Sequence, residues 1–346
     1  MSLEKINPSD DDFIKQNDDK MDAAKLKKLV KENMYAGVTV ALVSTVLSPA
    51  LAMAQGATAM MGLTTGIFGP AIAGVLGGSH YNILGPAGAL VNIVSNLSAN
   101  YGVDIVPWVT LVSGLMAFVV FLVKFENYCT MLPASVLEGF SLGVATTIGM
   151  GQFNNALGLG NQKRLAPYKD FVLPKHKEFY MNVGETFQNI DQAVWKDFFC
   201  FLPFFAVLMT LLRWKPSVPW IVIIAALGVI YGVIMEEVVG NIKYTPVLLR
   251  EIYPSLAQEV KLGQFGYWTP DPKKTFTLMN VIVGALKVAF VAVLETLISA
   301  RIADNKTNTR FDQSKEIFGM SLANMACGLL GGVPCTGVLI RTNVNV

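Results

Sequence analysis

The sequence GGVPCTGVLIRTNVNV occupies residues 331–346. Two glycines, a proline and a third glycine loosen the backbone, and an apolar run with one arginine follows, so an extended stretch and then a short helix are predicted. The sequence GGSHYNILGPAGALVNIV at 77–94 has the same plan. Interrupted apolar segments at matching positions of two repeats indicate a transport site near the middle of a membrane. Glycine and proline are also common in membrane helices in general, which is the alternative.

The composition indicates a membrane protein. The 346-residue chain is 53% hydrophobic and 15% charged, with a mean hydropathy of +0.47. Between Tyr35 and Val103 there is no Asp, Glu, Lys or Arg, a stretch long enough for about three membrane crossings of ~20 residues each. We therefore predict an all-α polytopic membrane protein in contact with the lipid bilayer. No enzyme chemistry and no nucleic-acid partner are expected, and four cysteines without metal-ligand spacing predict neither metal nor other cofactor.

Hydropathy divides the chain into eight spans and two shorter elements. The elements near 85–99 and 336–346 are too brief to cross about 30 Å of hydrocarbon, so we predict two half-helices that meet at the midplane. An amphipathic interfacial helix is predicted at 180–196. The predicted spans are 35–55, 58–77, 105–125, 131–152, 197–214, 218–237, 277–302 and 315–332.

Two of these spans precede each interrupted segment, which predicts an inverted repeat. The first repeat is expected at about 35–237, followed by a loop at 238–276 and an incomplete second repeat at 277–346. Residues 1–34 are predicted to be a cytosolic arm, because their basic end precedes the first span and cytoplasmic flanks carry excess Lys and Arg. The transmembrane domain is then 35–346. Which membrane holds it is left open.

The two half-helices predict an anion site. Irregular backbone at membrane depth is tolerated where it lines a cavity, and a helix N-terminus offers unpaired N–H groups and about half a positive charge. Two such ends facing one another would bind an anion through the main chain alone. The small residues Ala87, Gly88 and Gly337 would let the anion approach closely. Gln55, Tyr81 and Asn82 are further candidates for the cavity lining.

Two charged residues lie in apolar surroundings near this site. Arg341 follows one turn into the second half-helix, and it either marks the permeation path or snorkels to the interface. Glu295 lies deep in the span 277–302, where burial disfavours its charged form and a nearby Arg341 would oppose that effect. Protonation of Glu295 would then couple proton and anion movement, with Ser299 one turn on as a hydrogen-bond donor. A structural Glu–Arg pair without a transport role is the alternative.

Three stretches resemble one family. They are GGSHYNILGPAGA at 77–89, VLEGFSLGVATTIGMGQFNNALGLG at 136–160, and the block ETLISARIADNKTNTRFDQSKEIFGMSLANMACGLLGGVPCTGVLIRTNVN at 295–345. Together they resemble the sulfate permease (SulP) family of anion transporters, in order from about Gly37 to the last residue. The resemblance implies fourteen membrane segments in two inverted repeats of seven, a core and a gate domain, dimerisation and a cytosolic STAS domain.

The resemblance also implies a substrate pocket. Its members in this sequence would be Ala87 after the Gly-Pro pair, Glu295 with Ser299, the start of the tenth segment and one face of the first. The tenth segment contributes Gly337, Val338, Leu339 and Arg341, and the first contributes Val43, Leu47 and Leu51. Glu295 with Arg301 six residues on resembles proton-coupled sulfate symporters. Ile340 stands where many members have a hydroxyl residue.

By this comparison the chain contains segments one to ten, without the last four or a STAS domain. Three hypotheses remain. The chain is a secondary transporter of a small inorganic anion (sulfate, or bicarbonate, chloride or oxalate), working as a homodimer or with a second chain that supplies the missing segments. Alternatively it is a transport-inactive relative serving as a structural subunit, or a nucleobase permease of the same fold. Arg341 argues against the last, because a neutral ligand does not need its charge.

Overall fold

The computed structural model describes residues 23–124, 134–159, 173, 179–215, 218, 220–239 and 276–346. These residues are mostly helical, and five helices are long and apolar enough to cross a membrane. The predicted class, an all-α polytopic membrane protein, is confirmed. The candidate spans are Ala36–Ala54, Ala59–Leu76, Ile105–Val123, Trp195–Trp214 and Leu278–Thr307.

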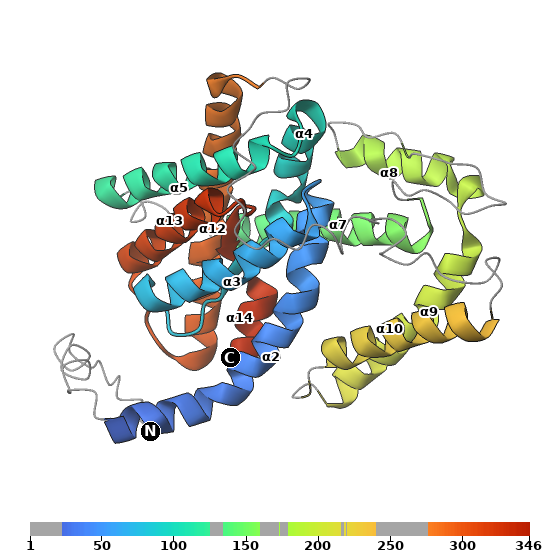
Figure 1. The fold of residues 1–346 in the computed structure, drawn as a ribbon, viewed down its shortest axis with the longest axis horizontal. Helices are drawn as coiled ribbons and strands as arrows, with labels where there is room; N and C mark the ends of the chain where they lie inside the picture. The colour runs from blue at the N-terminus through green and yellow to red at the C-terminus, as the bar shows by residue number, and fades with distance from the viewer. Residues whose placement is uncertain are drawn as a thin grey trace, which may run out of the picture.

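The two predicted units have the same order of elements. Each consists of two long helices, a three-residue strand and a short helix (Figure 1). The first unit comprises α2 (Ala23–Ala54), α3 (Ala59–Leu76), β1 (Leu84–Pro86), the 3-10 helix η1 (Gly88–Leu90) and α4 (Val91–Tyr101). The second comprises α12 (Leu278–Thr307), α13 (Gln313–Leu329), β2 (Cys335–Gly337) and α14 (Leu339–Asn345).

The remaining helices lie between these units in the sequence. They are α5 (Ile105–Val123), α7 (Ala134–Ala156), α8 (Phe179–Gln188), η2 (Ile190–Gln192), α9 (Trp195–Trp214) and α10 (Trp220–Val239). The predicted interfacial helix at 180–196 is therefore divided between α8, η2 and the start of α9. The predicted loop 238–276 lies almost entirely outside the described residues.

Two helices extend beyond the predicted spans. The predicted first span 35–55 corresponds to the candidate span Ala36–Ala54, and α2 already begins at Ala23, within the predicted arm 1–34. The seventh long span was expected to end at residue 302, but α12 continues to Thr307 and ends where Asn308 takes a left-handed conformation with φ 54°. Helix geometry continues past the apolar stretch in both cases, since polar side chains are compatible with a helix that leaves the hydrocarbon.

Side-chain caps start three of the long helices. The hydroxyl of Thr58 accepts a hydrogen bond from the Met61 amide at the start of α3, and Thr277 does the same for α12. Asp312 accepts from the amide of Lys315 at the start of α13. Each cap satisfies one of the amide groups that a helix N-terminus leaves without an internal partner.

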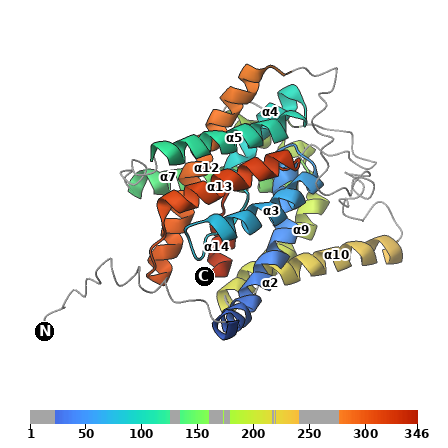
Figure 2. The ribbon, with the colours of Figure 1, turned by 60° about the vertical axis from the view of Figure 1, so that its left-hand side comes forward.

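Small residues bring α13 close to its neighbours. In both views α13 lies between α5 and α3 (Figures 1 and 2). A Cβ on Gly328 would lie 2.5 Å from the backbone nitrogen of Leu111 in α5, and one on Gly114 would lie 2.7 Å from that of Met325 in α13. Contacts between small residues of this kind are how helices associate in a membrane, where lipid removes the hydrophobic driving force.

We expect Gly328→Leu to destabilise the bundle by about 3 kcal/mol, because backbone atoms of α5 cannot make room for the new side chain. Thermal unfolding of the detergent-solubilised protein measures the effect. Gly74→Leu in α3 is the matched control, since no atom lies within 4 Å of a Cβ at that position. Equal unfolding temperatures for the two variants would contradict this account of the packing.

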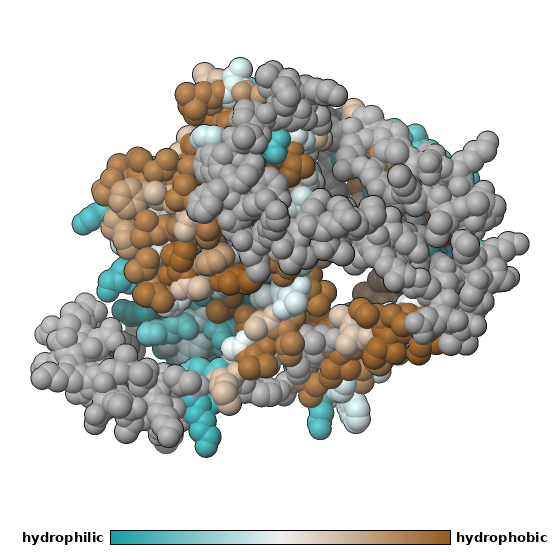
Figure 3. Space-filling model, in the orientation of Figure 1, coloured by the Kyte–Doolittle hydropathy of each residue, from teal (hydrophilic) through white to brown (hydrophobic). Residues whose placement is uncertain are grey.

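Apolar side chains cover much of the outer surface. Figure 3 shows them over α5 and over α10, and they include Val119, Leu122 and Val123 on the first helix and Leu227 and Val229 on the second. Surface of this kind is suited to lipid acyl chains. With the five candidate spans, it identifies the chain as an integral membrane protein.

Candidate functional site

The two interrupted segments are joined by hydrogen bonds. β1 pairs antiparallel with β2, with Leu84 opposite Gly337, Gly85 opposite Thr336 and Pro86 opposite Cys335. All six residues are buried. The predicted meeting of residues 85 and 337 is confirmed, and antiparallel pairing is what an inverted arrangement of the two units requires.

The short helices begin later than predicted. They were expected at 85 and 336, whereas η1 begins at Gly88 and α14 at Leu339. The reason is the strand pair, which holds the residues before each helix in an extended conformation. The residues that start the helices, Ala87 and Val338, have extended backbone angles and no side-chain cap.

Two polar side chains hold β2 in place. Asn324 of α13 donates to the carbonyl oxygen of Cys335 and accepts from its amide, both over 2.9 Å. The hydroxyl of Thr65 in α3 accepts from the Val333 amide and donates to the Val333 carbonyl oxygen, both over 2.8 Å. These contacts satisfy backbone groups that would otherwise be costly to bury.

Arg341 is fully buried. Its Nη2 donates to Ser48 Oγ of α2 over 2.9 Å, and its Nη1 donates to the carbonyl oxygen of Leu84 in β1 over 3.3 Å. The Nε atom is buried without a partner, and no carboxylate in the described part of the chain lies within ion-pair distance. The alternative of a snorkelling arginine is therefore wrong. Among the residues described, no acid neutralises this buried positive charge.

Glu295 lies next to β2. It is 8% exposed, and its Oε2 accepts a 2.7 Å hydrogen bond from the hydroxyl of Thr336 in β2. Arg341 donates to Leu84 and Ser48 and forms no ion pair with Glu295, so the alternative of a directly bonded Glu–Arg pair is wrong, whereas their expected proximity stays a prediction. Thr336 pairs with Gly85 of β1. The residue next to Gly85 in the same strand, Leu84, carries the carbonyl oxygen that accepts from Arg341.

The structure places the remaining residues of the second unit around the start of α14. Ser299 is buried, and its hydroxyl lies 3.0 Å from that of Thr342. Val338 is buried and Leu339 half-buried. Gly337 donates its amide to Thr296 Oγ1 over 2.9 Å, and a Cβ there would lie 2.6 Å from Asn82 Nδ2. Its small size therefore serves close packing in this structure.

Ala87 and Gly88 of the first unit stand at the start of η1. Ala87 is fully buried, and its carbonyl oxygen accepts from Gln55 Nε2 over 3.0 Å. Gly88 faces α7, since a Cβ on it would overlap the side chain of Ile148. Gln55 is fully buried and its Oε1 has no partner. On α2, Val43 is buried, whereas Leu47 and Leu51 are half-buried.

Sequence reasoning missed several polar residues of this region, Asn324, Thr65 and Thr296 among them. Ser48, Thr336 and Thr342 carry hydroxyl groups that bond to Arg341, Glu295 and Ser299, respectively. Glu316 in the first turn of α13, also missed, is 2% exposed. Single hydroxyl residues give little signal in an apolar sequence. Ile340, where the family resemblance would place a hydroxyl residue, is exposed, whereas the hydroxyl of Thr342 is buried.

Residues 30–346 match the Sulfate permease family. The chain belongs to this family. Among curated sulfate permease relatives, a putative sulfate transporter of Bacillus subtilis, YvdB, is 28% identical over 323 residues, covering 93% of this chain and 56% of the relative. The bicarbonate transporter BicA of Picosynechococcus is 21% identical over 340 residues, covering 92% and 53%. The chain thus spans about half the length of the curated relatives it matches.

Two solved structures share the sulfate permease fold with this chain. The transmembrane domain of a cyanobacterial bicarbonate transporter, BicA, has a TM-score of 0.68 at 23% identity and covers 90% of this chain and 75% of its own. The anion transporter Slc26a9 of mouse, in its inward-facing state, has a TM-score of 0.66 at 14% identity, covering 100% and 60%. At these identities the likeness establishes the fold alone.

Proposed function

We propose that this chain forms the anion site of a secondary active anion transporter. The observation that carries the proposal is Arg341, a fully buried guanidinium with an unpartnered Nε and no neutralising carboxylate in the described residues. An isolated buried charge is costly, and a bound anion would offset that cost. Ionisable residues inside membrane proteins mark substrate pathways for this reason.

The ends of the short helices support the same site. η1 and α14 both begin beside the strand pair, so the N–H groups of their first turns lie there. No side chain caps either helix. An anion between Gly88 and Leu339 would accept from these amides and lie in the field of Arg341. Val43, Leu47 and Leu51 would line it from α2, Ala87 and Val338 from the helix starts, and Ser299 from α12.

Sulfate is the first candidate substrate. The relative YvdB is named a putative sulfate transporter, whereas BicA is named a bicarbonate transporter. We expect selection among sulfate, bicarbonate, chloride and oxalate to depend on the hydroxyl and amide groups around the site. The reason is that the four anions differ in how many hydrogen bonds they can form with such groups.

Glu295 is proposed to couple proton and anion movement. Its carboxyl group is buried and bonded to Thr336, which belongs to the strand that leads into α14. A proton on Glu295 removes one negative charge near the site, so an anion would bind more tightly to the protonated form. Release of the proton would then accompany release of the anion, which makes the transporter a proton symporter.

We expect Glu295→Gln to remove the pH dependence of anion uptake into proteoliposomes. Glutamine keeps an oxygen that can accept from Thr336, so the local contact survives while the titrating group is lost. Initial uptake rates at several external pH values test this, with Asp191→Asn on the exposed segment η2 as the control. A Glu295→Gln variant whose uptake still rises with external proton concentration would remove Glu295 from the coupling step.

The two other functions make different predictions. A structural subunit would bind no anion, although it would hold the same fold. A nucleobase permease would bind a neutral base, and a neutral ligand would leave the Arg341 charge uncompensated. Uptake of labelled sulfate in the presence of unlabelled anions or of uracil separates the three functions. Only the proposed transporter takes up labelled sulfate in a way that other anions inhibit and uracil does not.

The proposal includes orientation and assembly. We place the N-terminus in the cytoplasm, on the basis of the lysines before the first span. A second copy or another chain is expected beside the exposed helices α9 and α10. Protease access to a tag at residue 1 in sealed vesicles tests the orientation, and the mass of the purified complex in detergent tests the assembly.

A further inference from the structure

Ile148 is an apolar residue of α7 that stands at the start of η1. A Cβ on Gly88 would overlap Ile148 Cδ1 and lie 2.9 Å from its Cγ1, so the end of the isoleucine fills the place that a side chain at position 88 would take. In a helix the Cα–Cβ bond is tilted toward the N-terminus. The isoleucine therefore lies toward the same end of η1 as the amide groups that are proposed to bind the anion.

Ile148 reaches this place from outside the two repeated units. Its helix packs against α8 and α9, and in the described part of the chain η1 is the element of the two units that α7 contacts most. The neighbouring positions of α7 are open, since no atom lies within 4 Å of a Cβ on Gly149 or Gly151. The contact between α7 and the start of η1 thus depends on the isoleucine side chain.

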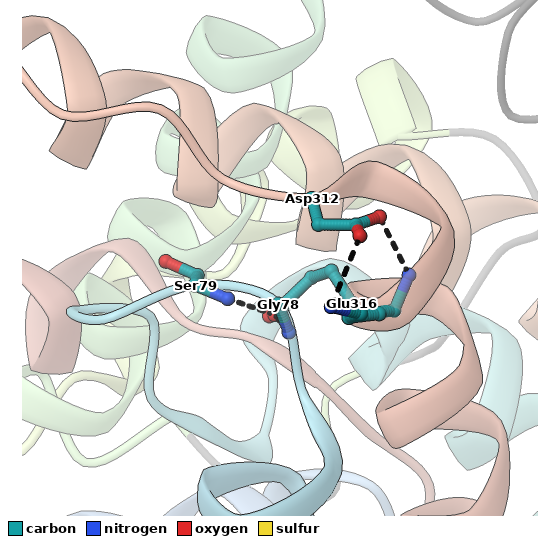
Figure 4. Close-up of polar contacts among 5 residues, drawn as sticks. Gly78, Ser79, Asp312 and Glu316 are labelled. Carbon is teal, nitrogen blue, oxygen red and sulfur yellow. Dashed lines mark hydrogen bonds and ion pairs between the residues drawn. The ribbon is translucent and has the colours of Figure 1, made fainter. Parts of the chain in front are cut away.

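The first unit is held firmly in front of α7. Glu316 Oε2 accepts from the amides of Gly78 and Ser79, both over 2.9 Å, and the Asp312 amide donates to the carbonyl oxygen of Gly78 over 3.0 Å. Figure 4 shows the two loop residues beside Glu316, with Asp312 at the start of the same helix. Between this loop and η1, β1 is paired with β2 along its whole length. The start of η1 therefore holds its place, which a site needs if it is to select a ligand by size.

We propose that Ile148 is a specificity-determining residue that closes the anion site on its α7 side and limits the size of the anion to that of sulfate. This inference rests on the proposed anion site between Gly88 and Leu339. The isoleucine has no hydrogen-bond donor, so it acts by occupying space beside the amides and by keeping water away from them. An anion with the charge and shape of sulfate but longer bonds overlaps this wall and binds less tightly.

Shortening Ile148 is expected to relax this selection in steps. Ile148→Val removes Cδ1, the atom nearest to a Cβ on Gly88, and Ile148→Ala removes Cγ1 as well. The matched control is Leu142→Ala on the same helix, because Leu142 is 69% exposed and the change removes the same number of carbon atoms as Ile148→Ala.

The test compares sulfate with molybdate, which has the same tetrahedral shape and double negative charge but longer bonds to oxygen. Both dissociation constants are measured by titration calorimetry at pH 8 on the full chain in detergent, and their ratio is compared among the variants. The wild type is expected to prefer sulfate by about tenfold, the effect of one surplus methylene group in a fitted pocket. The preference should fall to about threefold in Ile148→Val and disappear in Ile148→Ala, while Leu142→Ala retains it.

Gly88→Ala tests the contact itself. In the wild-type background its new Cβ overlaps Ile148, so the affinity for sulfate is expected to fall by about tenfold. In the Ile148→Ala background that space is free, and Gly88→Ala should then lower the affinity by less than about threefold. Equal losses in the two backgrounds would show that the residues do not act through this contact, and would overturn the inference.

The remaining outcomes separate the inference from the proposed function. If the wild type binds neither anion, the proposed function fails and this inference fails with it. If the wild type binds both anions equally, if Ile148→Ala keeps the wild-type ratio, or if Leu142→Ala shifts the ratio equally, only the inference is overturned. A uniform loss of affinity for both anions in Ile148→Ala, with a lower unfolding temperature, would show a merely structural role and would also overturn it.

Discussion

Arg341→Met is expected to leave the protein folded and to weaken anion binding by more than about 30-fold. Methionine fills much of the same volume, and replacing an unpaired buried charge with an apolar group is often neutral or stabilising for a fold. The ligand loses its positive partner, and the loss of one member of a buried charge pair costs about 2–5 kcal/mol in binding. Sulfate binding by calorimetry and thermal unfolding of the same sample measure the two effects separately.

The matched control for this prediction is Arg310→Met, because Arg310 is exposed between α12 and α13. It removes the same charge from the chain without touching the strand pair. Binding that falls equally in both variants would point to a general field effect. Unchanged binding in Arg341→Met would contradict the proposed site.

Gly85→Ala is expected to weaken anion binding by about tenfold to a hundredfold. A Cβ on Gly85 would overlap the Nη1 and Cζ atoms of Arg341, so the guanidinium has to move. Its hydrogen bonds to Leu84 and Ser48 are then lost, and contacts made by a charged donor are worth about 1.5–3 kcal/mol each. The end of a flexible side chain can shift without disrupting the fold, so the unfolding temperature should change little.

Gly37→Ala in α2 serves as the control for Gly85→Ala, since no atom lies within 4 Å of a Cβ at that position. Calorimetric titration with sulfate compares the two variants. Wild-type affinity in Gly85→Ala would show that the position of the guanidinium does not matter to the ligand.

The sequence predicted the architecture because the pattern that determines it is local. Long apolar runs predicted eight spans, five of which coincide with candidate spans of the described residues, and repeated Gly-Gly and proline signals predicted that 77–94 and 331–344 break at matching places. The strand pair that joins them was beyond that reasoning. Leu84 and Gly337 are 253 residues apart, and nothing in either three-residue strand indicates its partner.

The polar contacts of the site were the least predictable part. Arg341 and Glu295 were identified because a charge in an apolar run is conspicuous. Their partners are Ser48 and Thr336, small hydroxyl residues that are common in membrane helices and become informative only once their neighbours are known. The lack of an ion pair between Arg341 and Glu295 was unforeseeable for the same reason, since sequence shows which charges are buried but not which partner each one takes.

The central claim is that an anion binds where the two interrupted segments meet. The most direct measurement is the anomalous diffraction of crystals of the full chain soaked in selenate, which scatters strongly in place of sulfate. The account predicts a selenium peak between the starts of η1 and α14, next to the Arg341 guanidinium, that disappears in crystals of Arg341→Met. Selenium bound only at the protein surface, or a peak at this position that persists without the arginine, would contradict it.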